Sequence, residues 1–145
     1  MTMLRNDEIQ AALVAYLKSL TAVTSQLVTI DGIAIGATEI REDQWQGTEF
    51  EYPNIRVRMI SDIPYGDSDQ CNASSFTASV MVFSQDYSSQ QADRISGIIS
   101  TSLHGKSFIQ GSISMVLRTT NLIPAVRSDT NTWRSECLLQ GIASR

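Results

Sequence analysis

The chain has 145 residues, a length that fits one domain with a buried core. Its net charge of -4 argues against a dedicated nucleic-acid-binding protein, which usually carries a basic face. No apolar run approaches the roughly 20 residues of a membrane span, and the start turns acidic at Asp7 and Glu8 instead of forming a secretory signal. We therefore expect a single domain over residues 1–145, made in the cytoplasm and without a membrane partner.

The first predicted element is a helix over residues 6–20. Asn6 can cap its first turn, and the β-branched residues after Leu20 weaken helix propensity. Apolar residues recur along it at helical spacing: Ile9, Ala12, Leu13, Tyr16, Leu17 and Leu20. This stripe predicts a helix whose apolar face packs on a sheet.

Residues 27–35 are predicted to form a β-hairpin, because Asp31-Gly32 stands between β-forming residues and such a turn needs positive φ at both positions. The next residues, 36–52, are polar and irregular. They predict a long loop with at most one short turn of structure, and long loops in compact domains tend to be functional or disordered. This loop carries Trp45 and a group of acidic residues: Glu39, Glu42, Asp43, Glu49 and Glu51.

Two strands with a loop between them are predicted next. After Pro53, apolar residues at 55, 57 and 59 alternate with Arg56 and Arg58, which predicts one apolar and one basic strand face. Residues 62–74 predict a polar loop that carries Asp62, Asp67 and Asp69. Residues 76–83 give the longest strand pattern. Its second half is apolar on both faces, which predicts a strand covered on both sides there.

The last part of the chain predicts a helix and two strands. The helix begins at Ser88 or Ser89, runs to Leu103 and ends at His104-Gly105. Strands are predicted over residues 113–120 and 132–142, with a loop at 124–131. The order of elements predicts an α+β fold, an antiparallel or mixed β-sheet with two α-helices packed on it.

No pattern in the sequence points to catalysis, a metal or a cofactor. The single histidine, His104, stands at a predicted helix end, and no serine lies in a nucleophile-elbow motif. Asp62, Asp67 and Asp69 do not have the spacing of an EF-hand. We therefore expect no enzyme activity and no cofactor. Cys71 and Cys137 are expected to be free buried thiols, with a disulfide as the alternative.

Charged residues give the only candidate interaction site. Arg56 and Arg58 share one strand face, and Arg118, Arg134 and Glu136 can extend the same patch if their strands are neighbours. Two interpretations remain open: a solvated sheet face with weak cross-strand pairs, or a face that meets the acidic loops of a neighbouring subunit. The candidate subunit-interface residues are Arg56, Arg58, Glu42, Asp43, Trp45, Asp62, Asp67 and Asp69.

Several short segments together resemble a known family. They are the helix end Tyr16-Leu17-Lys18, the strand entry Tyr52-Pro53-Asn54-Ile55-Arg56-Val57, the segment Ile60-Ser61-Asp62-Ile63-Pro64, and the helix approach Gln85-Asp86-Tyr87-Ser88-Ser89-Gln90-Gln91-Ala92-Asp93. With the order of elements from Ile9 to Ile142, they make the chain similar to the tail terminator, or tail completion, proteins of long-tailed bacteriophages and phage-like particles.

This resemblance implies a structural virion protein without catalytic residues, made in the host cytoplasm. It implies a homo-oligomeric ring, expected to be a hexamer, at the head–tail junction. The ring would cap the tail-tube protein, contact a head-completion or connector protein, and let DNA pass through its lumen. The loops at 36–52 and 62–74 are candidates for subunit contacts. The alternatives are another head–tail joining protein and a small enzyme or ligand-binding domain.

Overall fold

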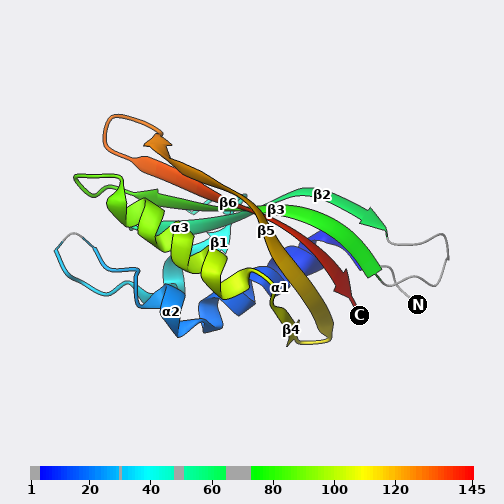
Figure 1. Ribbon diagram of the computed structural model, residues 1–145. Coiled ribbons are helices and arrows are strands. Elements are labelled where there is room, and N and C mark those ends of the chain that lie inside the picture. Colours follow the sequence, from blue (N-terminus) through cyan, green and yellow to red (C-terminus); the bar gives the residue numbers. More distant parts are fainter. Residues whose placement is uncertain (1–3, 30, 48–50, 65–72) are drawn as a thin grey trace.

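The computed structural model describes residues 4–29, 31–47, 51–64 and 73–145. The described strands form one mixed six-stranded sheet in the order β1-β2-β3-β6-β5-β4, with β1 and β2 parallel and every other pair antiparallel. The elements in chain order are α1 (Asn6–Ser19), α2 (Thr21–Thr24), the 3-10 helix η1 (Gly36–Glu39), β1 (Ile40–Glu42), β2 (Asn54–Pro64), β3 (Ala73–Ser84), α3 (Gln90–Leu103), β4 (Ser107–Gln110), β5 (Ile113–Arg127) and β6 (Trp133–Ser144). Figure 1 shows their arrangement. The predicted α+β class, with helices packed on a sheet, is confirmed.

The long helices α1 and α3 cover the same face of the sheet, which we call the inner face (Figure 1). Helix α3 packs on β3, β6 and β5, whereas α1 contacts β1 and β2 at one edge and β4 at the other. The Tyr16 ring of α1 stacks on the Phe108 ring of β4, with centroids 3.6 Å apart. The sheet therefore curls around α1 and brings its two edge strands to one helix.

A single apolar core lies between the helices and the inner face. The apolar spacings of the two long helices and of β2 and β3 predict nine buried residues, and all nine are buried: Ile9, Leu13, Leu17, Val57, Val80, Val82, Ile95, Ile99 and Leu103. Gly141 in β6 lies in this layer. A Cβ there would come within 2.9 Å or less of Leu117, Phe76 and the Val116 carbonyl oxygen, so only glycine fits without displacing them.

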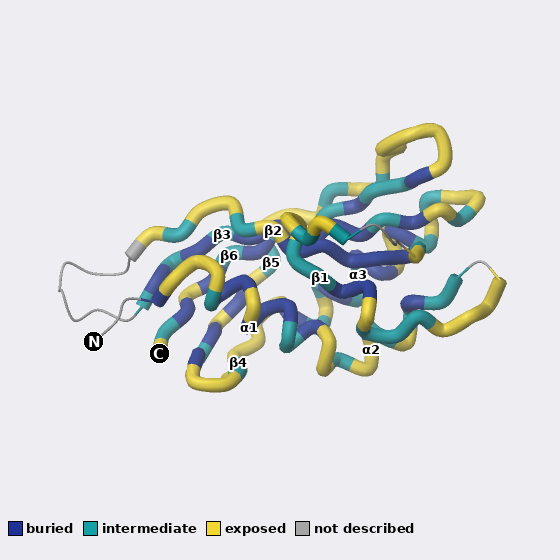
Figure 2. The backbone as a smooth tube through the Cα atoms, turned by 180° about the vertical axis from the view of Figure 1, so that it is seen from behind, coloured by how far each residue is buried: buried dark blue, intermediate teal, exposed yellow. Residues whose placement is uncertain are grey.

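The opposite face, which we call the outer face, is not covered by the described helices (Figures 1 and 2). In β6 the buried residues alternate with half-buried or exposed ones along nearly the whole strand, as expected for a sheet covered on one side. The prediction that β3 is covered on both sides holds at Met81, which is buried on the outer face, whereas Phe83 is only half-buried there.

Three strand assignments from the sequence were wrong or incomplete. The predicted loop at 36–52 contains η1 and the short edge strand β1, and residues 107–110 form the second edge strand, β4. Strand β5 does not end at Thr120. It continues to Arg127 through two register shifts, so the first half of the predicted loop at 124–131 is strand. β-Bulges interrupt the alternation of side chains, which is the pattern that predicts a strand.

The helix boundaries lie close to the predicted ones. Helix α1 ends before Leu20 as expected, but Arg5, not Asn6, occupies the N-cap position, where its backbone N–H donates to the Glu8 carboxylate. The short helix α2 was not predicted. Ser89 is the N-cap of α3, and Gly105, with φ +69°, follows its C-cap His104.

The hairpin predicted around Asp31-Gly32 forms only in part. A single isolated bridge joins Val28 to Ala34, and the Thr29 N–H donates to the Ile33 carbonyl oxygen at 2.9 Å. Gly32 has positive φ, but Asp31 does not, so the two-residue turn expected from the sequence is not formed.

Candidate assembly surfaces

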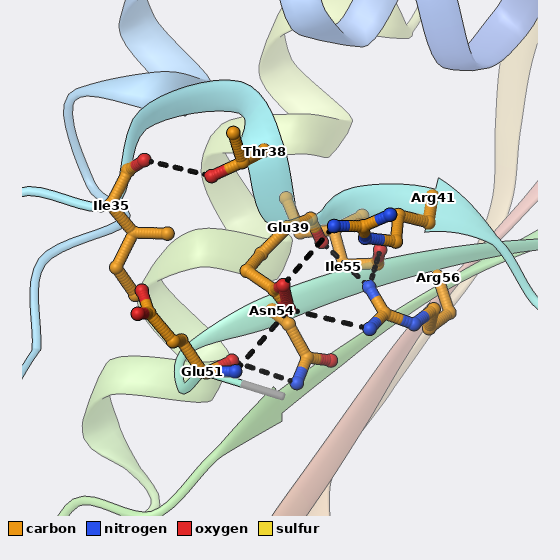
Figure 3. A network of polar contacts seen from close by, with 8 residues as sticks. All are labelled: Ile35, Thr38, Glu39, Arg41, Glu51, Asn54, Ile55 and Arg56. Carbon is orange, nitrogen blue, oxygen red and sulfur yellow. Dashed lines mark hydrogen bonds and ion pairs between the residues drawn. The ribbon is translucent and has the colours of Figure 1, made fainter. Parts of the chain in front are cut away.

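A buried ion pair lies where β1 and β2 meet (Figure 3). The Arg56 guanidinium is 3.4 Å from the Glu39 carboxylate, and both side chains are only 6% exposed. The same guanidinium donates to the carbonyl oxygens of Glu39, at 2.7 Å, and Ile55, at 3.0 Å. A buried charge is tolerated when it is paired and hydrogen-bonded, and Arg56 meets both conditions within its own chain.

Arg41 completes this cluster. In the parallel register Arg41 stands beside Arg56, and its guanidinium is 3.7 Å from the other oxygen of Glu39. Burial lowers the pKa of Arg56, whereas the Glu39 carboxylate opposes that change. Trp45 lies over the arginines, with its ring centroid 3.7 Å from the Arg41 guanidinium carbon and 5.6 Å from that of Arg56. These cation–π contacts hold Trp45 against the edge of the sheet.

The turn after β1 is fastened to α1. The Gln10 side chain donates to the Val57 carbonyl oxygen at 2.8 Å and exchanges hydrogen bonds with the Gln44 side chain. Glu39 also accepts from the Glu51 backbone N–H at 3.4 Å. Much of the segment predicted to be a free loop is therefore held against the domain.

The environment of Arg56 thus differs from both environments predicted for it. The sequence left open a solvated arginine or one that meets the acidic loop of a neighbouring subunit, but its acidic partner is Glu39 of the same chain, and its side chain is buried. Replacing Arg56 by glutamate would place two carboxylates together, so we expect Arg56→Glu to destabilise the β1 edge and not merely to alter a surface. No spacing in the sequence pointed to Glu39 as the partner, because the pairing depends on the parallel register of β1 and β2.

The other predicted charged residues gather on the outer face. Arg58 is exposed and stands opposite Ser79, whose hydroxyl donates to Glu136 at 2.9 Å. Arg134 lies 3.7 Å from Glu136, and Arg118 donates to the Gln140 side chain at 2.8 Å. Strands β5 and β6, which carry Arg118, Arg134 and Glu136, are neighbours, but β3 separates them from Arg58 on β2. These residues share the outer face, and whether they act as one patch stays a prediction.

The acidic candidates do not form one surface. Asp62 belongs to strand β2, not to a loop, and pairs in register with the inner-face residue Phe76, so it lies on the side of the sheet opposite to Arg58. Glu42 ends β1 and is half-buried, and Asp43 is exposed in the following turn. Asp67 and Asp69 lie outside the described residues. Their role in subunit contacts stays a prediction.

The described residues show no assembled reactive centre. No group of three or more His, Cys, Asp or Glu residues among them could hold a metal ion. His104 accepts a hydrogen bond from the Thr119 backbone N–H at 2.9 Å, which agrees with a helix-end role. Cys137 is a free buried thiol as predicted, and burial raises its pKa, whereas Cys71 is outside the described residues. In the described part of the chain, no helix has the length and apolarity to cross a membrane.

Comparisons with known proteins find similarity of fold but not of sequence. No protein-family model matches the chain, and no curated protein matches it. A chain in the virion of a native gene transfer agent particle has a similar structure, with a TM-score of 0.69 and 12% identity over 94% of this chain and 95% of that one. A second solved structure, whose name states no function, has a TM-score of 0.53 and 15% identity over 98% and 96% of the two chains.

At these identities the likeness establishes a shared fold.

Proposed function

We propose that this protein is a structural component of a phage-like virion that acts as a tail terminator. In this proposal, copies of the chain form a ring, expected to be a hexamer, that caps the tail tube and joins the tail to the head-side connector. The observation that carries the proposal is the fold shared, over nearly the full length of both chains, with a component of a gene transfer agent virion. The resemblance of the sequence to tail terminator proteins points to the same role.

Several features of the domain support a role in assembly. A ring is built from one heterologous contact that repeats until it closes, so each subunit needs two different patches. The uncovered outer face, with Arg58 and its neighbours, is one surface available for such a contact. Asp43 and Trp45 at the β1 edge remain candidates, as do Asp67 and Asp69. A chain with net charge -4 also suits a lumen that lets DNA pass without binding its phosphates.

The proposal is tested by adding the purified protein to tail tubes. We expect native mass spectrometry to detect a ring, and electron microscopy of a gold-labelled protein to place it at one end of each tube. A capped tube should not elongate when more tube protein is supplied, because the ring covers the surface to which the next subunit adds.

Two outcomes contradict the tail-terminator assignment. Binding to isolated heads but not to tubes would identify the protein as a different head–tail joining component. No binding to either structure, together with turnover of a small-molecule substrate, would point instead to an enzyme or a ligand-binding domain.

A further inference from the structure

Three segments meet at one end of the domain, and we call this surface the three-loop end: the loop residues 28–34 without 30, the loop residues 85–89, and the tip of the β5–β6 hairpin at residues 126–132. In Figures 1 and 2 these segments project at the same end of the sheet, beyond the start of α3. Two hydrogen bonds link them. The Gln85 side chain donates to the Thr132 hydroxyl at 3.3 Å, and the Gln91 side chain, in the first turn of α3, donates to the Val28 carbonyl oxygen at 3.1 Å.

The three-loop end presents apolar side chains to solvent. Tyr87 is 91% exposed and Ile33 is 65% exposed, and Val126 is also exposed. Asp86 accepts a hydrogen bond from the Tyr87 backbone N–H at 2.8 Å, which fixes the turn that presents this ring. Tyrosine is enriched among the residues that dominate protein–protein binding energy, so a fixed and almost fully exposed tyrosine is a candidate anchor.

Each of the three loops also carries an aspartate: Asp31, Asp86 and Asp129. The positive charge among them, Arg127, is already engaged, because its guanidinium lies over the Trp133 ring at 4.8 Å and donates to the Thr130 carbonyl oxygen. The three-loop end is therefore apolar and acidic.

The outer face has the complementary composition. Among the described residues of the four long strands, the exposed cations on this face are arginines, and the one acid on it, Glu136, is already paired with Arg134 and Ser79. Beside Arg118, the exposed aliphatic residues Ile142 and Val116 are cross-strand partners, and Ile63 stands in the same row with Ser75 between it and Ile142. Arginine is enriched in protein interfaces, and the exposed aliphatic side chains beside Arg118 offer apolar area that a protein partner can bury.

A shallow depression on the outer face can receive an aromatic ring. It is lined by Ser75, Val116, Arg118, Gln140 and Ile142 and has a volume of about 290 Å³, well above the ~10–15 Å³ that a single water needs on the same measure. Four strands about 4.8 Å apart and about ten residues long give this face roughly 600 Å². That area approaches the roughly 800 Å² that each partner of a standard interface buries.

The edges of the sheet offer less for self-association. The free edge of β5 is closed by α3, because His104 accepts from the Thr119 backbone N–H and Asp93 accepts from the Ala125 backbone N–H, at 2.9 and 2.8 Å. The edge strands β1 and β4 contain only three and four residues. Strand β1 pairs only with Ile55–Val57 of β2, so residues 58–64 of β2 extend beyond it. The short edge strands and the contacts of α3 with β5 disfavour strand addition along the rest of the sheet edge, and the outer face is the larger docking surface.

From these observations we infer that the three-loop end of one copy docks on the outer face of the next copy, with Tyr87 in the depression lined by Val116, Ile142 and Arg118. Asp31 and Asp86 then face the arginines of the neighbouring copy. The two patches are different, so the contact is heterologous and repeats from copy to copy. This inference rests on the proposed function, because it names the subunit contact of the proposed ring.

The test uses two charge-reversed proteins and their mixture. The end variant carries Asp31→Lys and Asp86→Lys, and the face variant carries Arg58→Glu and Arg118→Glu. Sedimentation velocity over a concentration series should show self-association of the wild-type chain and at least tenfold weaker association of either variant. An equimolar mixture of the two should recover association, because each reversed patch then meets a patch of opposite charge. The matched control Arg94→Glu, on the exposed side of α3, should behave like the wild type.

A second variant keeps the test independent of loop folding. Tyr87→Ser removes only an exposed ring, so it should leave the melting temperature unchanged while weakening self-association at least tenfold. Normal association of Tyr87→Ser, a mixture that fails to recover, or a wild-type chain that stays monomeric at millimolar concentration would each overturn the inference. Rings that cap tail tubes but tolerate all of these changes would retain the proposed function and refute this contact. Association through these patches without binding to tail tubes would support this contact and refute the proposed function.

Discussion

The change Glu39→Gln tests whether the buried ion pair with Arg56 holds the β1 edge in place. For unit charges 3.4 Å apart, an effective dielectric constant of about 20 gives a gross attraction of roughly 5 kcal/mol. Glutamine keeps an oxygen acceptor, and it avoids the cost of burying a carboxylate. Both effects offset part of the attraction that is lost. We expect Glu39→Gln to lower the free energy of unfolding by about 2–4 kcal/mol.

A double-mutant cycle isolates the pair from these side effects. Arg56→Met alone leaves a buried carboxylate whose remaining cationic partner is Arg41, whereas the combined change Glu39→Gln with Arg56→Met removes both charges. The double variant should therefore be more stable than the sum of the single effects predicts, with a coupling energy of about 2 kcal/mol or more. Urea unfolding followed by far-UV circular dichroism, and by tryptophan fluorescence at the β1 edge, measures each stability.

The pair formed by Arg134 and Glu136 provides a matched control. It has the same chemistry at 3.7 Å, but Arg134 is 41% exposed, so solvent screens the charges. Its coupling energy should stay below about 1 kcal/mol. Additive effects at Glu39 and Arg56, within about 0.5 kcal/mol, would refute the claim that their charges depend on one another.

Three further predictions follow from burial and close packing. Leu13→Asp places an unpaired charge in the core and should cost about 3–5 kcal/mol; a variant that melts like the wild type would disprove the packing of α1. Gly141→Ala should lower the free energy of unfolding by about 1–3 kcal/mol, because the added Cβ meets neighbouring atoms. Gly97→Ala should raise it by about 0.5–1 kcal/mol, because the added Cβ has nothing within 4 Å. Thermal melts that rank the two variants in the opposite order would contradict this. In a Cys71→Ser background, Cys137 should react with a thiol reagent only as fast as the fold opens. Burial raises the pKa of the Cys137 thiol in the folded state, so the free energy of unfolding should fall as the pH rises above about 8.5, the pKa of an unfolded cysteine. Prompt labelling of Cys137 at neutral pH would contradict its burial.

The local sequence determined the main elements and the core. The apolar spacings of α1 and α3 and the alternation in β2, β3 and β6 are short-range patterns, so they specify which side chains are buried before any partner is known. The sequence also identified His104 and Gly105 as a helix end, because the cap depends on residues next to one another.

The tertiary structure decided which charges meet. Glu39 and Arg56 lie 17 positions apart, and only the parallel pairing of β1 and β2 brings them together. The three residues of β1 are too few to show a period, and bulges disturb the alternation in β5. Whether an arginine on a strand is exposed, like Arg58, or buried, like Arg56, depends on what folds over it. That cover comes from residues distant in the chain, and local propensity carries no information about it.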